Sequence, residues 1–197
     1  MLDDLAGLDR AIFLFFNVHM ANTVTDIVMP LVTSDTLLRI AYLMAALILL
    51  WKGDRRTRWL VLFSALTLAV TDQMVSHWLK PLIARPRPCH TLPIDSIRLL
   101  VGCGSGYSMP SSHAANAFGQ AILFGLAFRR AIWWLVGLAV VIAFSRVFVG
   151  VHYPGDILTG SLLGALTGFV LFHAHGRTLV FIDKKHPPTG AGGFKQL

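Results

Sequence analysis

The sequence predicts an all-α membrane protein, a polytopic helix bundle with five transmembrane spans and a sixth left open. Composition is the first observation, since 55% of the 197 residues are hydrophobic and only 14% are charged, whereas about a quarter of a soluble domain is charged. The mean hydropathy of +0.64 agrees with this. The second observation is that apolar runs long enough to cross a bilayer recur along the chain. The length suits one compact bundle and leaves little room for a second domain.

Five apolar runs form the predicted spans. They cover residues 36–52, 58–78, 111–128, 131–149 and 155–175. Tryptophans fall near the ends of these runs, at Trp51, Trp59, Trp78, Trp133 and Trp134. Aromatic belts occupy the two membrane interfaces, so these positions support the proposed boundaries.

The first 35 residues do not contain a clear span. The stretch AIFLFFNVHM (11–20) is apolar but short, and polar residues interrupt this part of the chain at Asn17, His19, Asn22 and Asp26. We expect residues 1–35 to form two short amphipathic helices at the membrane interface rather than a sixth crossing.

Short basic loops indicate the orientation of the bundle. KGDRRTR (52–58) carries four basic residues, Arg129–Arg130 join the third and fourth runs, and Arg177, Lys184 and Lys185 come after the fifth. Lys and Arg collect in cytoplasmic loops, and five alternating spans place all three groups inside. The loop at 79–110 and the turn at 150–154 then both lie outside. The same bias explains the net charge of +7, so no nucleic-acid partner is expected.

The chain is expected to divide into the N-terminal segment, a transmembrane domain over residues 36–176, and a cytoplasmic tail over residues 177–197. The end of this tail, KKHPPTGAGGFKQL, is rich in Pro, Gly and Lys. That composition is typical of disordered segments, and we expect the tail to be disordered.

Two local patterns concern packing and stability. Gly160, Gly164 and Gly168 repeat every four residues on one stripe of the fifth run, a spacing that lets helix backbones approach closely. Cys89 and Cys103 both lie in the external loop. An oxidising compartment permits a disulfide between them, but the sequence leaves their pairing open.

Two polar clusters flank the second and third runs. KPLIARPRP (80–88) supplies Lys80, Arg85 and Arg87 on the outer side, either as a patch that meets anionic headgroups or as cations held by a stiff, proline-rich path. YSMPSSHAAN (107–116) resembles a helix start with Ser111 available as a cap. A helix N-terminus attracts anions, and His113 in its first turn can exchange a proton near neutral pH.

A third polar cluster, SRVFVGVHYPGD (145–156), joins the last two runs. Asp156 lies four residues after His152 and can hold one imidazole nitrogen, which leaves the other free as a nucleophile or base. Arg146 lies within an apolar run, where an unpaired guanidinium costs several kcal/mol and therefore requires an anionic partner.

Together the three clusters suit an anionic tetrahedral group. Phosphoryl transfer requires a nucleophile, an acid for the leaving group and positive charge around the phosphate oxygens. The clusters provide all three without a metal. A zinc site is less consistent, because His113 and His152 have no cysteine or carboxylate set at ligand spacing.

The motifs resemble the three-part signature of type 2 phosphatidic acid phosphatases, a superfamily that also includes glucose-6-phosphatase and vanadium haloperoxidases. The matching stretches are Lys80-x6-Arg87-Pro88, Pro110-Ser111-Ser112-His113 and Ser145-Arg146-x5-His152-x3-Asp156, within residues 58–175. One position departs from the usual pattern, since Ser112 stands where the family generally has Gly. A serine amide still donates, but the phosphate approaches the main chain less freely.

The resemblance implies a role for each matching residue. His152 would attack phosphorus, Asp156 would orient His152, and His113 would protonate the leaving oxygen and then activate water. The phosphate oxygens would be held by Lys80, Arg87, Arg146, the Ser111 hydroxyl and the Ser112 amide. Arg85 lies outside the signature and would act behind these residues or at a headgroup. No cofactor or metal is implied.

The function expected from this resemblance is removal of phosphate from a lipid at the outer leaflet. The expected location is the inner (cytoplasmic) membrane of a bacterium, with the site facing the periplasm or exterior and with the bilayer and a lipid phosphate as partners. Undecaprenyl diphosphate is favoured on resemblance alone; phosphatidylglycerol phosphate, phosphatidic acid and lipid A 1-phosphate are alternatives. A lipid phosphotransferase, a vanadate-dependent peroxidase and a non-enzymatic lipid-binding or transport protein also stay open, as does the oligomeric state.

Overall fold

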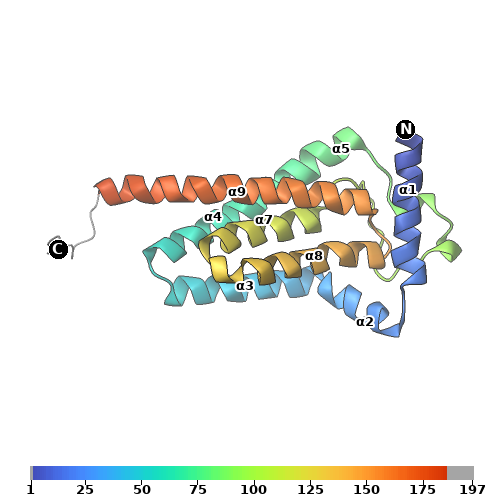
Figure 1. Ribbon diagram of the computed structural model, residues 1–197, viewed down its shortest axis with the longest axis horizontal. Helices are drawn as coiled ribbons and strands as arrows, with labels where there is room; N and C mark the ends of the chain where they lie inside the picture. The colour runs from blue at the N-terminus through green and yellow to red at the C-terminus, as the bar shows by residue number, and fades with distance from the viewer. Residues whose placement is uncertain (1, 186–197) are drawn as a thin grey trace.

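The computed structural model describes residues 2–185, and all regular structure in that range is helical. Five helices form a bundle in which they run along a common direction (Figure 1). They are α3 (Asp35–Lys52), α4 (Arg55–Asp72), α7 (Ser112–Ala127), α8 (Ile132–Phe148) and α9 (Pro154–Lys185). Each of the five predicted runs overlaps one of these helices, and the run 58–78 continues beyond α4 into the π-helical turn that follows it.

The all-helical membrane fold is confirmed, but the number of spans is not. Three helical stretches are long and apolar enough to cross a membrane, Arg55–Thr91, Arg129–Phe148 and Pro154–Lys185. A fourth span is obtained if the bent pair Asp4–His19 and Thr23–Val32 counts as one. The counts of five or six therefore stay predictions.

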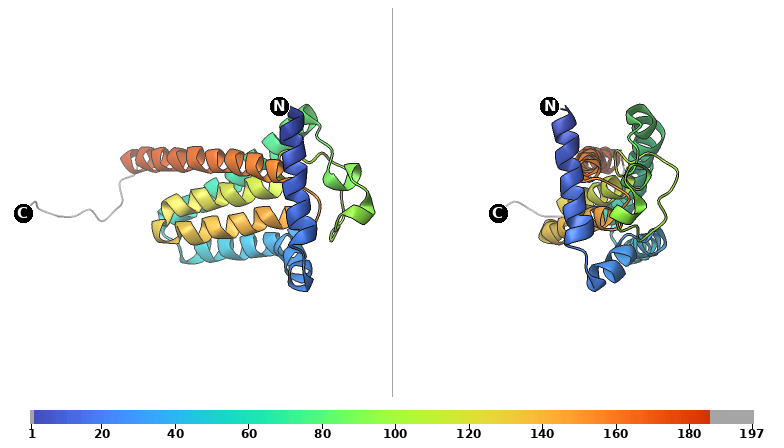
Figure 2. Two further views of the ribbon diagram at one scale, coloured as in Figure 1. Left: turned by 45° about the vertical axis from the view of Figure 1, so that its right-hand side comes forward. Right: turned by 90° about the vertical axis from the view of Figure 1, so that its right-hand side faces the viewer.

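The N-terminal segment folds as short helices at one end of the bundle. α1 (Leu2–Leu14) continues into a π-helical turn, η1 (Phe15–His19), and α2 (Thr23–Val32) comes next at a bend of 114°. Figure 2 shows α1 crossing the end of the bundle. The buried Asn17 amide fixes this segment, because it donates to the Phe148 carbonyl at 2.8 Å and accepts from the Arg98 amide at 2.8 Å.

The connections between bundle helices are short, except for the outer loop. α4 continues through the π-helical η2 (Gln73–Leu79) into α5 (Lys80–Ile83), and the loop then contains α6 (Pro88–Thr91) and the 3₁₀ turn η3 (Ile94–Ser96). A second 3₁₀ turn, η4 (Arg129–Ala131), joins α7 to α8. Cys89 and Cys103 form a disulfide across the outer loop, with their Cα atoms 6.2 Å apart, which answers the question left open by the sequence.

The glycine stripe of α9 packs directly against α7, as its spacing predicts. A Cβ atom added at Gly164 would overlap the Ala115 carbonyl, and one added at Gly168 would overlap the carbonyl of Gly119. The backbones of the two helices approach closely because these positions carry no side chain.

Replacing Gly164 with alanine is expected to destabilise the bundle by about 1–3 kcal/mol, the usual cost of overpacking. The matched control is Gly176→Ala on the same helix, where an added Cβ has no atom within 4 Å. That change should be neutral or slightly stabilising, because alanine favours helix over glycine. Thermal unfolding in detergent measures both. Equal midpoints for the two variants would contradict the close packing of α7 and α9.

The last helix corrects one expectation. Residues 177–185 were expected to begin a disordered tail, but α9 continues to Lys185. The apolar sequence TLVFI (178–182) sustains the helix, and the Pro- and Gly-rich composition begins only after it. Arg55 and Asp183 form an ion pair at 3.4 Å, which connects this end of α9 to α4. Residues 186–197 of the expected tail lie outside the described residues.

Candidate active site

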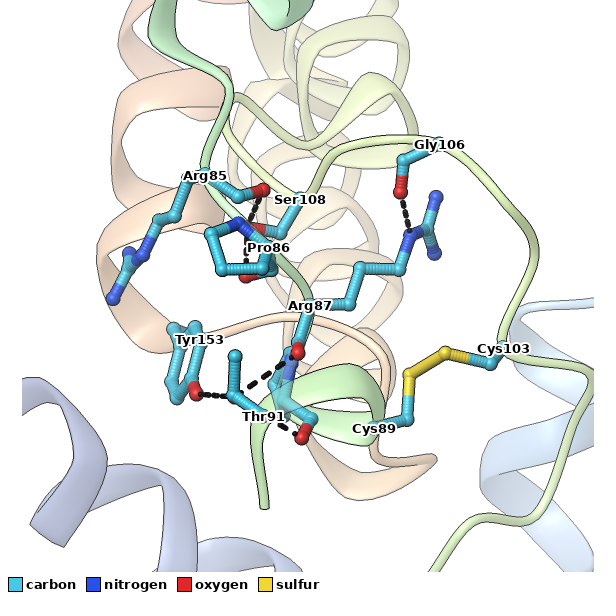
Figure 3. The surroundings of a disulfide bond; sticks show 10 residues. Arg85, Pro86, Arg87, Cys89, Thr91, Cys103, Gly106, Ser108 and Tyr153 are labelled. Atoms are coloured by element: carbon cyan, nitrogen blue, oxygen red, sulfur yellow. Dashed lines mark hydrogen bonds between the residues drawn. A yellow bond between two sulfur atoms is a disulfide. The ribbon is translucent and has the colours of Figure 1, made fainter.

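The three motif segments meet at the end of the bundle where α8 ends and α9 begins. The Ser108 amide donates to the Arg85 carbonyl at 2.8 Å (Figure 3). The Ser111 amide donates to the Asp156 carbonyl at 3.0 Å. The first bond joins positions 23 residues apart in the chain, and the second joins positions 45 residues apart. Together they hold the three motif segments side by side.

A tight turn after α8 positions His152. Gly150 has φ +87°, and a Cβ there would overlap the Arg98 carbonyl, so the turn requires glycine. The Val151 and His152 amides both bond the Arg146 carbonyl, at 3.2 and 3.3 Å. Pro154 then begins α9, as proline commonly does in the first turn of a helix.

His152 and Asp156 form a buried pair across this turn. His152 Nδ1 lies 3.3 Å from Asp156 Oδ2, and the two side chains are 2% and 0% exposed. The Tyr153 amide donates to the same carboxylate oxygen at 2.8 Å. Burial lowers the pKa of His152 to about 3, although Asp156 opposes this shift. The imidazole is therefore neutral at physiological pH, and a proton on Nδ1 that faces Asp156 leaves Nε2 with a lone pair.

Arg146 reaches the site from the last turn of α8. Its Nη1 donates to the Thr33 hydroxyl at 2.6 Å, whereas its buried Nε has no hydrogen-bond partner among the described residues. Only 9% of the residue is exposed. A buried guanidinium with spare donors suits an anion that is supplied from outside the protein.

Lys80 and Arg87 add two more cations near Arg146. Arg87 Nε donates to the Gly106 carbonyl at 2.8 Å (Figure 3). The three positive charges lie close enough to oppose one another, and those of Arg146 and Arg87 also act on His152. Within residues 4–185 none of the three forms an ion pair. Their mutual repulsion is relieved when an anion binds between them.

The start of α7 contributes the second histidine. Ser111 is the N-cap, and its buried hydroxyl accepts from the Ala114 amide at 3.5 Å. Ser112 is the first residue of α7, and its hydroxyl lies 3.5 Å from that of Ser76. His113 Nε2 lies 3.2 Å from the Thr33 carbonyl and 3.3 Å from Asp35 Oδ1. The Ser111 hydroxyl thus accepts within its own helix and keeps its proton available to donate.

The structure shows four residues whose polar contacts at the site could not be predicted from the sequence. Thr33 and Asp35, at the junction of α2 and α3, contact Arg146 and His113. Asp9 of α1 and Arg85 of the outer loop connect to Asp156. Arg85 was expected behind the signature residues or at a headgroup, whereas the other three lie outside every motif and carry no spacing signal.

An apolar cavity of about 690 Å³ opens beside His113 and Ser112. It extends between α3, α4, α7 and α8, and its lining includes Leu38, Leu68, Ala121, Phe124 and Leu135. The cationic end of the bundle therefore adjoins a space that suits a hydrocarbon chain.

Cations beside a buried histidine–aspartate pair, at one end of a helical membrane bundle, form an arrangement that suits a phosphatase acting on lipids. The chain belongs to the PAP2 superfamily, because the model described as PAP2 superfamily matches residues 59–179.

Comparisons with curated relatives agree with this assignment. The chain is 32% identical over 209 aligned positions to "Lipid A 4'-phosphatase" of Bacteroides thetaiotaomicron, covering 100% of this chain and 90% of the relative. It is 27% identical over 164 positions to "Undecaprenyl-diphosphatase BcrC" of Bacillus subtilis, covering 82% of this chain and 81% of the relative.

Two solved structures share the fold. The PAP2-type phosphatidylglycerolphosphate phosphatase from Bacillus subtilis superposes with a TM-score of 0.69 at 22% identity, over 94% of this chain and 89% of the other. Aquifex aeolicus LpxE superposes with a TM-score of 0.66 at 22% identity, over 84% and 95%.

Proposed function

We propose that this chain hydrolyses a lipid phosphate at the outer leaflet through a phosphohistidine on His152. The observation that carries this proposal is the buried pair of His152 and Asp156. The positive charges of Arg87 and Arg146 lie close enough to act on the His152 imidazole. A neutral imidazole close to cations can attack an anionic phosphate, because those cations offset the charge that otherwise repels a nucleophile.

In the proposed first step, His152 Nε2 attacks the terminal phosphorus and the bond from this phosphorus to the leaving oxygen breaks. The leaving oxygen is the ester oxygen of a lipid monophosphate or the bridging oxygen of a lipid diphosphate. Asp156 stabilises the positive charge that develops on the imidazole and keeps Nδ1 protonated. Lys80, Arg87, Arg146 and the Ser112 amide hold the equatorial oxygens. The Ser111 hydroxyl accepts from the Ala114 amide at 3.5 Å, and its own proton can donate to a phosphate oxygen.

His113 is proposed to give its proton to the leaving lipid oxygen and then to take one from water. This water attacks the phosphohistidine, which releases inorganic phosphate and restores His152. The Asp35 carboxylate, 3.3 Å from His113 Nε2, stabilises the imidazolium before the first transfer and again after the second. The apolar cavity begins at His113, so a lipid whose oxygen is protonated there can extend its chain into the bundle.

The site is proposed to face the periplasm or exterior of an inner membrane. α9 begins at the site and ends at Lys184–Lys185, and the basic segments at 52–58 and 129–130 lie at the same far end as Lys185 (Figure 1). Basic residues mark the cytoplasmic end. The Cys89–Cys103 disulfide lies in the loop at the opposite end, and disulfides persist in oxidising compartments.

Undecaprenyl diphosphate is the substrate that we favour. A largely apolar cavity of about 690 Å³ between four helices suits a single hydrocarbon chain, and a prenyl diphosphate has one chain, whereas lipid A has several. The second candidate is lipid A phosphorylated at the 4' position, which is favoured by the full-length similarity to a lipid A 4'-phosphatase.

Phosphate release from a panel of lipids in detergent tests both candidates. We expect the highest kcat/KM with undecaprenyl diphosphate, compared with phosphatidylglycerol phosphate, phosphatidic acid and lipid A carrying a 1- or 4'-phosphate. Activity should persist in EDTA, since no step uses a metal. A preference for 4'-phosphorylated lipid A would overturn the prenyl assignment, and loss of all activity in EDTA would overturn the mechanism. Adding a second lipid as acceptor distinguishes hydrolysis from phosphotransfer by its products.

A further inference from the structure

Arg85 connects two carboxylates that are far apart in the sequence. Its Nη1 donates to Asp156 Oδ1 at 2.8 Å, and its Nη2 donates to Asp9 Oδ2 at 2.6 Å. Asp156 is fully buried, and the side chains of Arg85 and Asp9 are 22% and 15% exposed. A planar guanidinium fork is the group that can bridge two carboxylates in fixed directions.

The second oxygen of Asp9 reaches the helix that carries Asp156. Asp9 Oδ1 accepts from the Gly155 amide at 2.7 Å. A Cβ atom at Gly155 would lie 3.0 Å from Asp9 Oδ2 and 3.4 Å from Arg85 Nη1, so the absence of a side chain lets α1 approach this turn. α1 is therefore tied to the first turn of α9 both directly and through Arg85.

Tyr153 restricts the guanidinium further. The Arg85 guanidinium carbon lies 4.2 Å from the Tyr153 ring centroid, and the Tyr153 hydroxyl lies 2.9 Å from that of Thr91. Phe13 of α1 meets the same ring edge-on, with centroids 5.4 Å apart. The Arg85 guanidinium is thus held by the Tyr153 ring against its planar face and by hydrogen bonds from both of its Nη atoms.

These contacts determine which way the Asp156 carboxylate points. Oδ2 faces His152 and the Tyr153 amide, while Oδ1 faces Arg85. If Arg85 were absent, Oδ1 would be buried without its cationic partner, and the carboxylate could rotate away from the imidazole. Asp9 offsets the charge of Arg85, so the three groups together keep the single negative charge that His152 needs when it becomes phosphorylated.

We propose that Arg85 and Asp9 are positioning residues, through which α1 fixes the orientation of Asp156 towards His152. The inference rests on the proposed attack by His152. It assigns to the N-terminal segment a part in catalysis, although this segment lies outside the region matched by the family model, residues 59–179.

Steady-state phosphate release by Arg85→Gln, Asp9→Asn and the double variant tests the proposal. Arg85→Gln should lower kcat by about 10- to 100-fold with KM nearly unchanged. This is the effect of removing the hydrogen-bond partners that orient histidines in metal sites, used here as an analogy. Asp9→Asn should lower kcat less, because the asparagine oxygen can still accept from the Gly155 amide and only the pairing with Arg85 is lost. It should therefore have no further effect once Arg85 is Gln. Arg85→Lys keeps the charge but cannot bridge both carboxylates, so it should recover only part of the lost kcat.

Arg98→Gln is the matched control. The Arg98 side chain pairs with Asp26 and so forms another arginine–aspartate link between the N-terminal segment and the outer loop, one that does not include Asp156. This variant should keep the parent kcat even if its thermal midpoint falls. Equal losses of kcat in the Arg98 and Arg85 variants, or additive effects of Asp9→Asn and Arg85→Gln, would overturn the positioning role.

Failure of this inference can be distinguished from failure of the proposed function. If His152→Ala is inactive while the Arg85 and Asp9 variants keep the parent kcat, only the positioning role is wrong. If His152→Ala keeps phosphate release, the proposed mechanism is wrong as well.

Discussion

Replacement of His152 by alanine is expected to reduce phosphate release to the background rate, a loss of about 10⁵- to 10⁶-fold by analogy with removal of a catalytic nucleophile. Alanine removes the atom that would form the bond to phosphorus, and Asp156 cannot replace it because its carboxylate is bound to Arg85 and the Tyr153 amide. Phosphate release from lipid phosphate in detergent measures the effect. Quenching with alkaline detergent during turnover should also trap phosphate on the parent protein and none on the variant, and acid should release this trapped phosphate.

The control for this variant is His90→Ala. His90 is an exposed histidine of α6 in the outer loop, and it has no role in the proposed steps. Its replacement should leave phosphate release within about twofold of the parent, as surface substitutions usually do. Residual turnover of one tenth or more in His152→Ala would show that the histidine is not the nucleophile.

Arg146→Leu is expected to change activity and stability in opposite directions. Loss of the guanidinium should lower kcat/KM by about 10²- to 10³-fold, the usual effect of removing one donor to a developing charge. The thermal midpoint should rise, because leucine removes a buried cation whose Nε has no partner within the described part of the chain. Phosphate release and thermal unfolding in detergent measure the two effects.

Two controls accompany the Arg146 variant. Arg146→Lys keeps a cation and should recover part of the activity, but without the fork of donors. Arg130→Leu removes an exposed arginine at the opposite end of the bundle and should leave kcat/KM unchanged. A fall of activity and thermal midpoint together in Arg146→Leu would mean that the guanidinium stabilises the fold rather than awaiting a phosphate.

Much of the fold could be predicted because helices that face lipid are written as long, uninterrupted apolar runs. Apolar runs defined all five bundle helices, and the glycine stripe indicated the contact between α9 and α7. The predicted end of the fifth run at residue 175 was too early, because the apolar stretch TLVFI (178–182) continues α9 to Lys185. The number of spans depends on how helices sit in the bilayer, which apolar length alone does not determine.

The signature residues could be located from the sequence because each motif keeps its own internal spacing. The contacts between motifs could not. Asp9, Thr33 and Asp35 reach the site from the N-terminal half through the bend between α1 and α2. No periodicity in one sequence encodes that bend, so these residues became visible only in three dimensions.

The length of α9 has a consequence for the side of the membrane opposite the site. At 1.5 Å per residue its 32 residues measure about 48 Å, whereas the hydrocarbon core is about 30 Å thick. Since the helix starts at the active-site end, about three turns of α9 extend beyond the hydrocarbon core on the opposite side. The ion pair between Arg55 and Asp183 connects these turns to α4. A protein domain fused directly after Lys185 would therefore start clear of the lipid headgroups.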